Sequence, residues 1–162
     1  MDMKRGIIIM AAGLLLLGCA TQQERAERRE LTRRAVEQAV ADRQLRIDVT
    51  SMSTMRYGTR MVTSDFFLRL HGDTLQSYLP YLGQAYQAPM ASPARGLNFE
   101  ERIARLTESR PKADQVRLDI DVKTDEDTYH YIVDIFNTGK ADIRVQSQHR
   151  DAISFNGDCQ LP

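Results

Sequence analysis

The residues with the clearest chemical role are Leu16-Leu17-Gly18-Cys19, which follow the basic pair Lys4-Arg5 and an apolar stretch over residues 7–17. A basic segment, a short apolar segment and a small residue before the cut are typical of a secretory signal, and a cysteine at the cut makes it a lipobox. A membrane-spanning helix needs ~20 apolar residues, so this stretch is too short for a permanent span. We therefore expect cleavage after Gly18 and attachment of lipid to the sulfur of Cys19.

The residues after Cys19 bear on location. Ala20 stands where an aspartate would favour inner-membrane retention in Gram-negative sorting, and Ala20-Thr21-Gln22-Gln23 lacks the acidic run common in surface-exported lipoproteins. A diacyl anchor supplies two hydrocarbon tails and hence stable attachment. We expect the membrane to be a partner through the lipid on Cys19, in the outer membrane and on its periplasmic face. Exposure at the cell surface stays open.

A second group of residues is suited to binding. Tyr78, Tyr81 and Tyr86 surround Pro80, and rings with a polar tip offer a large contact area plus a hydrogen bond. Pro80 cannot donate to a strand ladder, so it favours an edge or a bulge that would re-aim Tyr81. The alternative is that Tyr78 and Tyr81 lie on opposite faces of a strand, one in the core and one at its rim. We predict a shallow ligand-binding site formed by Tyr78, Tyr81, Tyr86 and Asn98.

The residue types used in catalysis and metal binding lack the spacing that those functions need. His71, His130 and His149 are far apart in the chain, so no two share the three- or four-residue spacing that brings two ligands to one metal. Cys159 has no adjacent basic residue to stabilise a thiolate. The chain also has no Gly-x-Ser-x-Gly elbow and no phosphate-binding glycine motif. The sequence therefore predicts a protein that is not an enzyme and that holds no metal or cofactor.

Carboxylates cluster at Glu100-Glu101 and at Asp125-Glu126-Asp127. Neighbours on a strand point to opposite faces, so Glu100 and Glu101 are not expected to share a site. The second cluster is typical of a solvated hairpin tip, because acidic residues form turns. It also lacks the ligand spacing of a calcium loop. Neither cluster predicts catalysis or cation binding.

Composition limits the partners and the size of the core. The 162 residues include 22 Lys and Arg against 22 Asp and Glu, for a formal net charge of zero. No excess positive charge is present to neutralise a phosphate backbone, so nucleic acid is not an expected partner. The length allows one domain with one core. With Cys19 committed to lipid, we expect Cys159 to be an inert thiol near a loose C-terminus, with intermolecular pairing as the alternative.

Residues 21–44 predict a charged helix, because acidic and basic residues alternate there without Gly or Pro. Its second half is expected to dock on the domain, and its first half to be a solvated spacer from the membrane. A coiled coil with a partner is the alternative, but the segment holds fewer than three heptads. The docking stripe near one face of the helix consists of Leu31, Ala35, Val36, Ala39 and Val40.

After Gln44 the hydrophobic period switches to two, as in a half-buried strand. Strands are expected at residues 45–50, 64–70, 74–81, 116–122, 128–136, 141–145 and 151–155, with tight turns at 71–73 and 137–140. Such hairpins without interleaved helices predict a mainly β fold, an antiparallel meander in a small barrel or strongly curled sheet. Residues 83–96 form a long irregular segment, which is typical of a functional loop.

Several segments resemble a family of small Bacteroidota lipoproteins, the domain-of-unknown-function family numbered 4251. The most specific part is Ser77-Tyr78-Leu79-Pro80-Tyr81-Leu82-Gly83 with Gly96-Leu97-Asn98-Phe99. The similarity covers most of the chain, and implies an envelope lipoprotein with a β-rich domain but no known activity. The other resembling segments are the lipobox, the charged helix, Thr63-Ser64-Asp65, Asp73-Thr74-Leu75, Ala85-Tyr86, Ile135-Phe136-Asn137 with Gly139, and Ile153-Ser154-Phe155-Asn156-Gly157.

The sequence thus predicts three parts: a signal peptide over residues 1–18, a lipidated cysteine and charged helical spacer over 19–44, and a β domain over 45–162. The leading functional hypothesis is a non-catalytic module that binds a small apolar ligand or another envelope component. One alternative is a scaffold subunit of an envelope protein complex, for which large exposed apolar faces would be evidence. The other is a hydrolase, which would need convergent polar groups in the mouth of the barrel.

Overall fold

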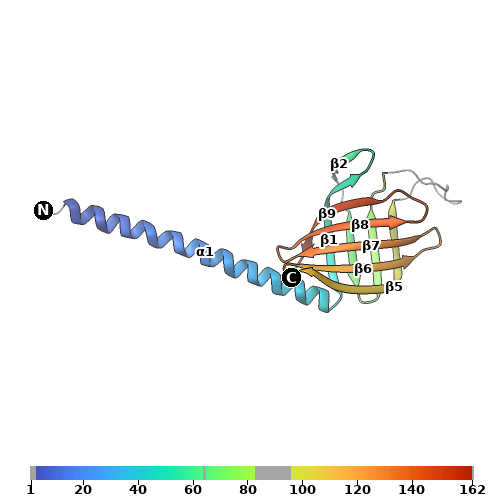
Figure 1. The fold of residues 1–162 in the computed structure, drawn as a ribbon, viewed down its shortest axis with the longest axis horizontal. Coiled ribbons are helices and arrows are strands. Elements are labelled where there is room, and N and C mark those ends of the chain that lie inside the picture. The colour runs from blue at the N-terminus through green and yellow to red at the C-terminus, as the bar shows by residue number, and fades with distance from the viewer. Residues whose placement is uncertain (1–2, 64, 83–95, 162) are drawn as a thin grey trace.

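The computed structural model describes residues 3–63, 65–82 and 96–161, with side chains from residue 22 onward. The described residues form one helix followed by nine strands (Figure 1). The elements are α1 (Met3–Ala41), β1 (Gln44–Thr54), β2 (Gly58–Met61), β3 (Phe67–His71), β4 (Thr74–Leu79), β5 (Leu97–Lys112), β6 (Gln115–Lys123), β7 (Thr128–Phe136), β8 (Lys140–Ser147) and β9 (Ile153–Gln160).

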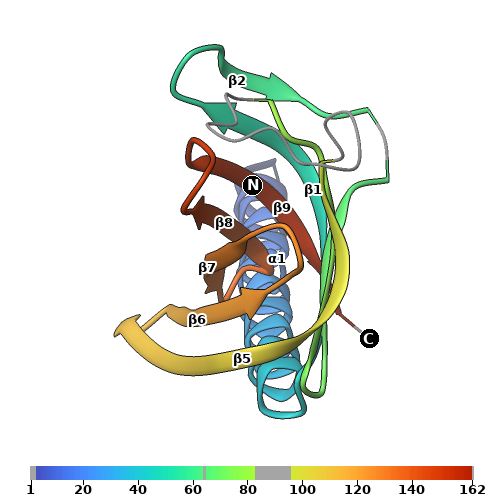
Figure 2. The same cartoon turned by 90° about the vertical axis from the view of Figure 1, so that its right-hand side faces the viewer.

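Eight of the strands close into an antiparallel barrel. Each strand from β3 to β8 pairs with the next along the chain, and β1 pairs with both β3 and β9, which completes the ring. β2 is appended to the far end of β1, where Ser51 pairs with Met61. Figure 1 shows β6 to β9 crossing the early strands behind them steeply, and Figure 2 shows β5 bending from one side of the ring to the other. The expected mainly β, barrel-like fold is confirmed.

The barrel interior is filled with side chains. Alternate residues along each strand point inward, and those of β6 and β7 are buried from Val116 to Val122 and from Tyr129 to Ile135. A hydrogen-bonded chain crosses the core, since Tyr131 Oη donates to Ser77 Oγ at 3.1 Å and Ser77 Oγ donates to the Leu97 carbonyl at 2.6 Å. A space among the inner leucines and isoleucines measures about 10 Å³. That is at most the room for one water molecule.

The last turns of α1 close one end of the barrel. Val36, Ala39 and Val40 are buried, and the helix contacts β1 and β7. In Figure 2 the helix lies behind the space that the strands enclose. Leu31, expected on the docking stripe, is 65% exposed. The stripe is shorter than predicted because the helix leaves the barrel near Thr32, which lies beside the β7–β8 turn at Gly139. Residues 22–29 are exposed on every side.

The structure changes several expected strand boundaries. β2 and β5 were not expected: β2 is exposed along its whole length and β5 carries charged residues on both faces toward its end. β4 ends at Leu79, so Pro80 follows the strand and does not interrupt it.

Cys159 is not in a loose terminus. It lies in β9 opposite Ile47, and its N–H donates to the Gly139 carbonyl at 2.7 Å. Burial raises the pKa of the Cys159 thiol to about 12. The thiol is therefore protonated near neutral pH, when it is a poor nucleophile.

Candidate functional site

The end of the barrel opposite α1, called here the mouth, gathers polar groups from separate segments. Because the strands are antiparallel, this end holds the end of β4, the start of β5, the β6–β7 turn and the β8–β9 connection. Segments that are distant in sequence therefore meet there.

Asp127 is the buried carboxylate of the mouth. Its side chain is 2% exposed, and its Oδ1 accepts from the Thr128 N–H at 2.8 Å and faces His149 Nδ1 at 3.1 Å. Among the described residues, its Oδ2 is buried without a hydrogen-bond partner, as is Ser147 Oγ one strand away. An unsatisfied buried polar atom costs about 1–3 kcal/mol. Buried polar atoms without partners are rare in native proteins. A ligand that binds at the mouth would explain these two.

The turn that buries Asp127 is closed by Thr124. The N–H of Thr124 donates to the Asp127 carbonyl at 2.9 Å, and Thr124 Oγ1 accepts from the N–H groups of Glu126 and Asp127 at 3.2 and 3.1 Å. Hydroxyl side chains favour turns through such local bonds. The expectation of a fully solvated acidic tip is therefore wrong for Asp127, while Asp125 and Glu126 are exposed.

Arg150 is a buried cation at the mouth. Its side chain is 7% exposed, and its Nη2 lies 3.1 Å from Glu126 Oε2. Its guanidinium lies 5.3 Å from the centre of the Tyr81 ring, within cation–π range. Tyr81 Oη in turn donates to the Asp151 carbonyl at 3.4 Å. These contacts place buried charge against aromatic surface at the rim of the barrel.

A cleft of about 180 Å³ opens beside the mouth, between the start of β5 and the β6–β7 turn. Its aromatic wall is Phe99 stacked on Tyr129, with ring centres 5.4 Å apart. Burial raises the pKa of Tyr129. The residues that line this cleft, called the side cleft below, are Gly96, Asn98, Phe99, Glu101, Thr124, Asp125, Glu126 and Tyr129. Three of them are acidic and none is basic.

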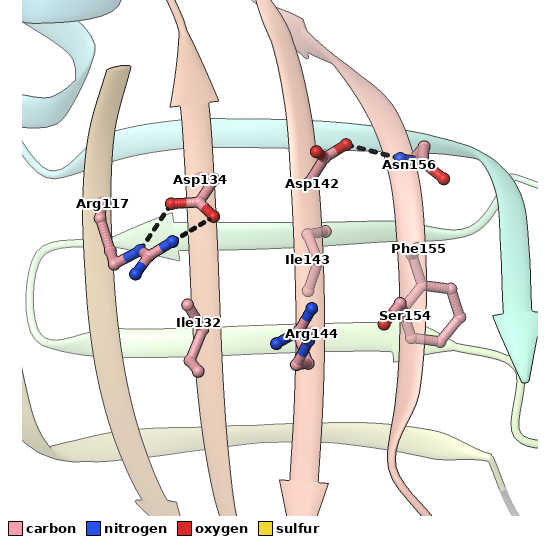
Figure 3. Close-up of a pocket in the computed structure, with 9 residues that line it drawn as sticks. All are labelled: Arg117, Ile132, Asp134, Asp142, Ile143, Arg144, Ser154, Phe155 and Asn156. Atoms are coloured by element: carbon pink, nitrogen blue, oxygen red, sulfur yellow. Dashed lines mark hydrogen bonds and ion pairs between the residues drawn. The ribbon is translucent and has the colours of Figure 1, made fainter. Parts of the chain in front are cut away.

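A second cavity of about 220 Å³ lies on the outer face of β6 to β9 (Figure 3). There the Arg117 guanidinium meets the Asp134 carboxylate through two contacts of 2.7 and 2.8 Å, and Asn156 Nδ2 donates to Asp142 Oδ1 at 2.5 Å. The Arg117 hydrogen bonds hold the pKa of Asp134 below its usual range. These side chains form hydrogen bonds with one another, whereas the mouth contains buried polar atoms that lack partners. The mouth is therefore the stronger candidate for a binding site.

The structure describes three of the four residues predicted to form a ligand site. Tyr78 and Asn98 are cross-strand partners on β4 and β5, and Tyr78 is 44% exposed. Tyr81 turns to the mouth and packs against the core, which agrees with the alternative that one tyrosine packs inward. Tyr86 lies outside the described residues, and so does the side chain of Cys19. A site shared by all four predicted residues stays a prediction.

Sequence reasoning missed Asp127, His149 and Arg150. The available signal was the spacing of Thr124 and Asp127, because a hydroxyl three residues before an aspartate can close a turn and bury it. Within the described residues, no group of three or more His, Cys, Asp or Glu side chains is arranged to hold a metal ion. Nor does any helix there combine the length and apolarity needed to cross a membrane.

Comparisons with other proteins identify relatives of this barrel. The sequence model of the family described as Domain of unknown function (DUF4251) matches residues 27–159. A DUF4251 family protein from Bacteroides eggerthii DSM 20697 has a similar solved structure, with a TM-score of 0.63 at 12% identity. The similarity covers 81% of this chain and 88% of that one, and it shows a common fold. No curated protein matches the chain.

Proposed function

This chain belongs to the family of domain of unknown function DUF4251, and we propose that it is a lipid-anchored, non-catalytic module that binds an envelope component at the mouth of its barrel. The observation that carries the proposal is the contrast between a filled interior and an incompletely satisfied mouth. The interior leaves about 10 Å³, whereas Asp127 Oδ2 and Ser147 Oγ are buried at the mouth without partners.

The filled interior weighs against an internal apolar ligand. Pockets for small molecules usually measure ~300–1,000 Å³ and are lined mostly by apolar side chains. The side cleft is smaller, at about 180 Å³, and is lined by carboxylates and aromatic rings. Such a surface fits a segment of a larger envelope component better than a lipid tail. Saturable binding of a fluorescent fatty acid to the folded protein would contradict this choice of ligand.

The anchor follows from the lipobox and the exposed helix. The lipobox predicts lipid on Cys19, and the exposed residues 22–29 would separate the barrel from the membrane. We expect Cys19→Ser to release the protein from the membrane fraction, and unchanged fractionation would remove the anchor from the proposal. Protease treatment of intact cells tests the side of the outer membrane, because a protein on the periplasmic face is protected.

Site-specific photo-crosslinking tests the binding surface. We expect a photo-reactive residue at Asn98, which lines the side cleft, to form a discrete adduct in intact cells. The same residue at Glu24, on the solvated part of α1, is the matched control. Adducts of equal yield at both positions, or none at Asn98, would contradict binding at the mouth.

A scaffold role is the second candidate, favoured by apolar exposure on the β1–β2 hairpin. Met55 is 92% exposed, Met61 74% and Tyr57 51%. Exposed methionines are common on protein-binding surfaces because their side chains adapt to different partners. A crosslink from Met55 but not from Asn98 would favour this candidate over the mouth.

A further inference from the structure

The first residues of β5 have a strand partner on one side only. β5 pairs with β4 from Leu97 to Arg102, but its pairing with β6 begins at Ile103, opposite Val122. β6 ends at Lys123, where Thr124 closes the turn into β7. Within the part of the chain that the structure describes, residues 97–102 therefore form an open strand edge beside the side cleft.

The backbone of this edge presents donors and acceptors to the cleft. The Ile103 N–H donates to the Asp73 carbonyl of the β3–β4 turn at 2.8 Å, which directs the odd-numbered residues toward β4. Backbone groups of an antiparallel strand alternate between its two sides. Asn98 and Glu100 therefore turn their N–H and C=O groups away from β4. A row of unpaired groups is a template for an added strand.

The acidic side chains of the side cleft favour an added strand that carries positive charge. Glu101, Asp125 and Glu126 line it, and none of the described Lys or Arg residues does. Arg150 contacts Glu126 at 3.1 Å, but neither Glu101 nor Asp125 forms an ion pair with a described residue. The partly buried Phe99 ring lines the same cleft and offers a cation–π surface there. An acidic segment would meet repulsion here, whereas a lysine or arginine would meet opposite charge.

We propose that the edge of β5 at Asn98 and Glu100 binds an extended basic peptide of a partner protein as an added strand. Addition of a strand to a sheet edge is a recurring mode of peptide recognition, in which backbone bonds give affinity and alternate side chains give specificity. Basic residues two positions apart lie on one face of the peptide, ~6.6 Å apart along it. That face meets the carboxylates of the side cleft. The inference rests on the proposed binding function and names its ligand class.

The test uses the full chain carrying Cys19→Ser and a labelled seven-residue peptide of alternating lysine and valine with blocked ends. Binding is followed by fluorescence anisotropy. We expect saturable binding that weakens as salt rises, because the charges are exposed. An alternating glutamate and valine peptide should bind at least about 10-fold more weakly, because its charges are repelled by the cleft. A lysine and valine peptide methylated on alternate amides should also bind at least about 10-fold more weakly, because it loses backbone hydrogen bonds to the edge.

The matched variants separate the cleft from general charge. Glu101→Gln with Asp125→Asn should weaken the lysine and valine peptide about 5–10-fold, whereas Glu24→Gln with Glu27→Gln on the solvated helix should leave it within about 2-fold. Absence of saturable binding, equal binding of the methylated peptide, or equal effects of the two double variants would each overturn the inference. If the Asn98 crosslink forms while the peptides fail, the proposed function stands and only its ligand class is wrong. If both fail, both are wrong.

Discussion

The two ends of the barrel are built on opposite principles. The end closed by α1 buries apolar side chains, namely Val36, Ala39 and Val40, and keeps its charges outside, where Arg33 pairs with Glu30 and Glu37. The mouth buries the charged residues Asp127 and Arg150 and leaves an oxygen of Asp127 without a partner. Departures from full polar satisfaction concentrate at functional sites in natural proteins. The difference supports the proposal that the closed end contributes stability and the mouth binds a partner.

The strongest way to break the comparison is to put a charge into the closed end. Val36→Asp should lower the free energy of unfolding by about 3–5 kcal/mol, because a fully buried carboxylate would have no partner. Urea unfolding of the Cys19→Ser chain measures it. Leu31→Asp, one turn and a half earlier at an exposed site, should change stability by less than about 0.5 kcal/mol. Equal effects would show that the helix does not close the barrel.

The second test removes the buried charge of the mouth. Arg150→Met should lower the free energy of unfolding by about 1–2 kcal/mol, through loss of the contacts with Glu126 and the Tyr81 ring. The loss is smaller than at the closed end because Glu126 is exposed enough to be solvated alone. Lys140→Met breaks the exposed Lys140–Asp158 pair and should cost no more than about 0.5 kcal/mol. A larger loss of unfolding free energy for Lys140→Met than for Arg150→Met would show that Arg150 is not a buried charge that stabilises the mouth.

The third test compares the mouth with the satisfied outer face. Arg117→Met should cost about 0.5–1 kcal/mol at neutral pH, since it removes the two-contact pair with Asp134. Arg117 lowers the pKa of Asp134, so the pair stabilises the fold above the usual aspartate pKa. This contribution is lost as pH falls through the lowered pKa. Urea unfolding of both proteins over a pH series should therefore show the difference at pH 7 and its disappearance in acid; a constant difference would be the contrary result.

The smallest effect is expected at the joint between α1 and β1. Arg43 adopts a left-handed backbone with φ of 51°, a conformation that costs a non-glycine residue about 1–2 kcal/mol. Its side chain pairs with Asp73 at 2.6 Å on the surface. Arg43→Gly relieves the strain, but it loses the pair and adds the backbone freedom of glycine to the unfolded chain, so we expect a net change within about 0.5 kcal/mol. Arg43→Ala loses the pair and keeps the strain, so thermal unfolding should rank it below Arg43→Gly.

Periodicity predicted the barrel where each strand has one inner and one outer face. β6 alternates from Val116 to Val122 and is buried at every second residue. Periodicity could not predict β5, because the end of this strand from Glu108 onward is exposed on both faces. Gly157 marks another tertiary constraint: a Cβ there would clash with the Asp48 carbonyl oxygen. That contact depends on the β1–β9 pairing and has no local signal.

The candidate site was less accessible to sequence reasoning than the fold. Tyr81 and Asn98 were singled out by residue type, and both lie near the mouth. Asp127 resembled its exposed neighbours Asp125 and Glu126, and only the closed turn at Thr124 distinguishes it. Its contact with His149 joins residues 22 positions apart. The β7–β8 hairpin decides this contact, because the register that pairs Tyr129 with Ser147 brings Asp127 opposite His149.

The exposed part of α1 couples distance to direction. A helix advances ~1.5 Å and turns ~100° per residue. A deletion within the solvated residues 22–29 therefore shortens the helix and also rotates the barrel about the helix axis. Removing seven residues would draw the barrel ~10 Å toward the proposed anchor at Cys19 and leave its azimuth nearly unchanged, whereas removing two would swing the mouth ~200° around the helix axis with ~3 Å of shortening. A flexible tether would show neither dependence. If the yield of the Asn98 crosslink in cells depends on the rotation more than on the length of the helix, the mouth must face a fixed direction relative to the membrane to bind its partner.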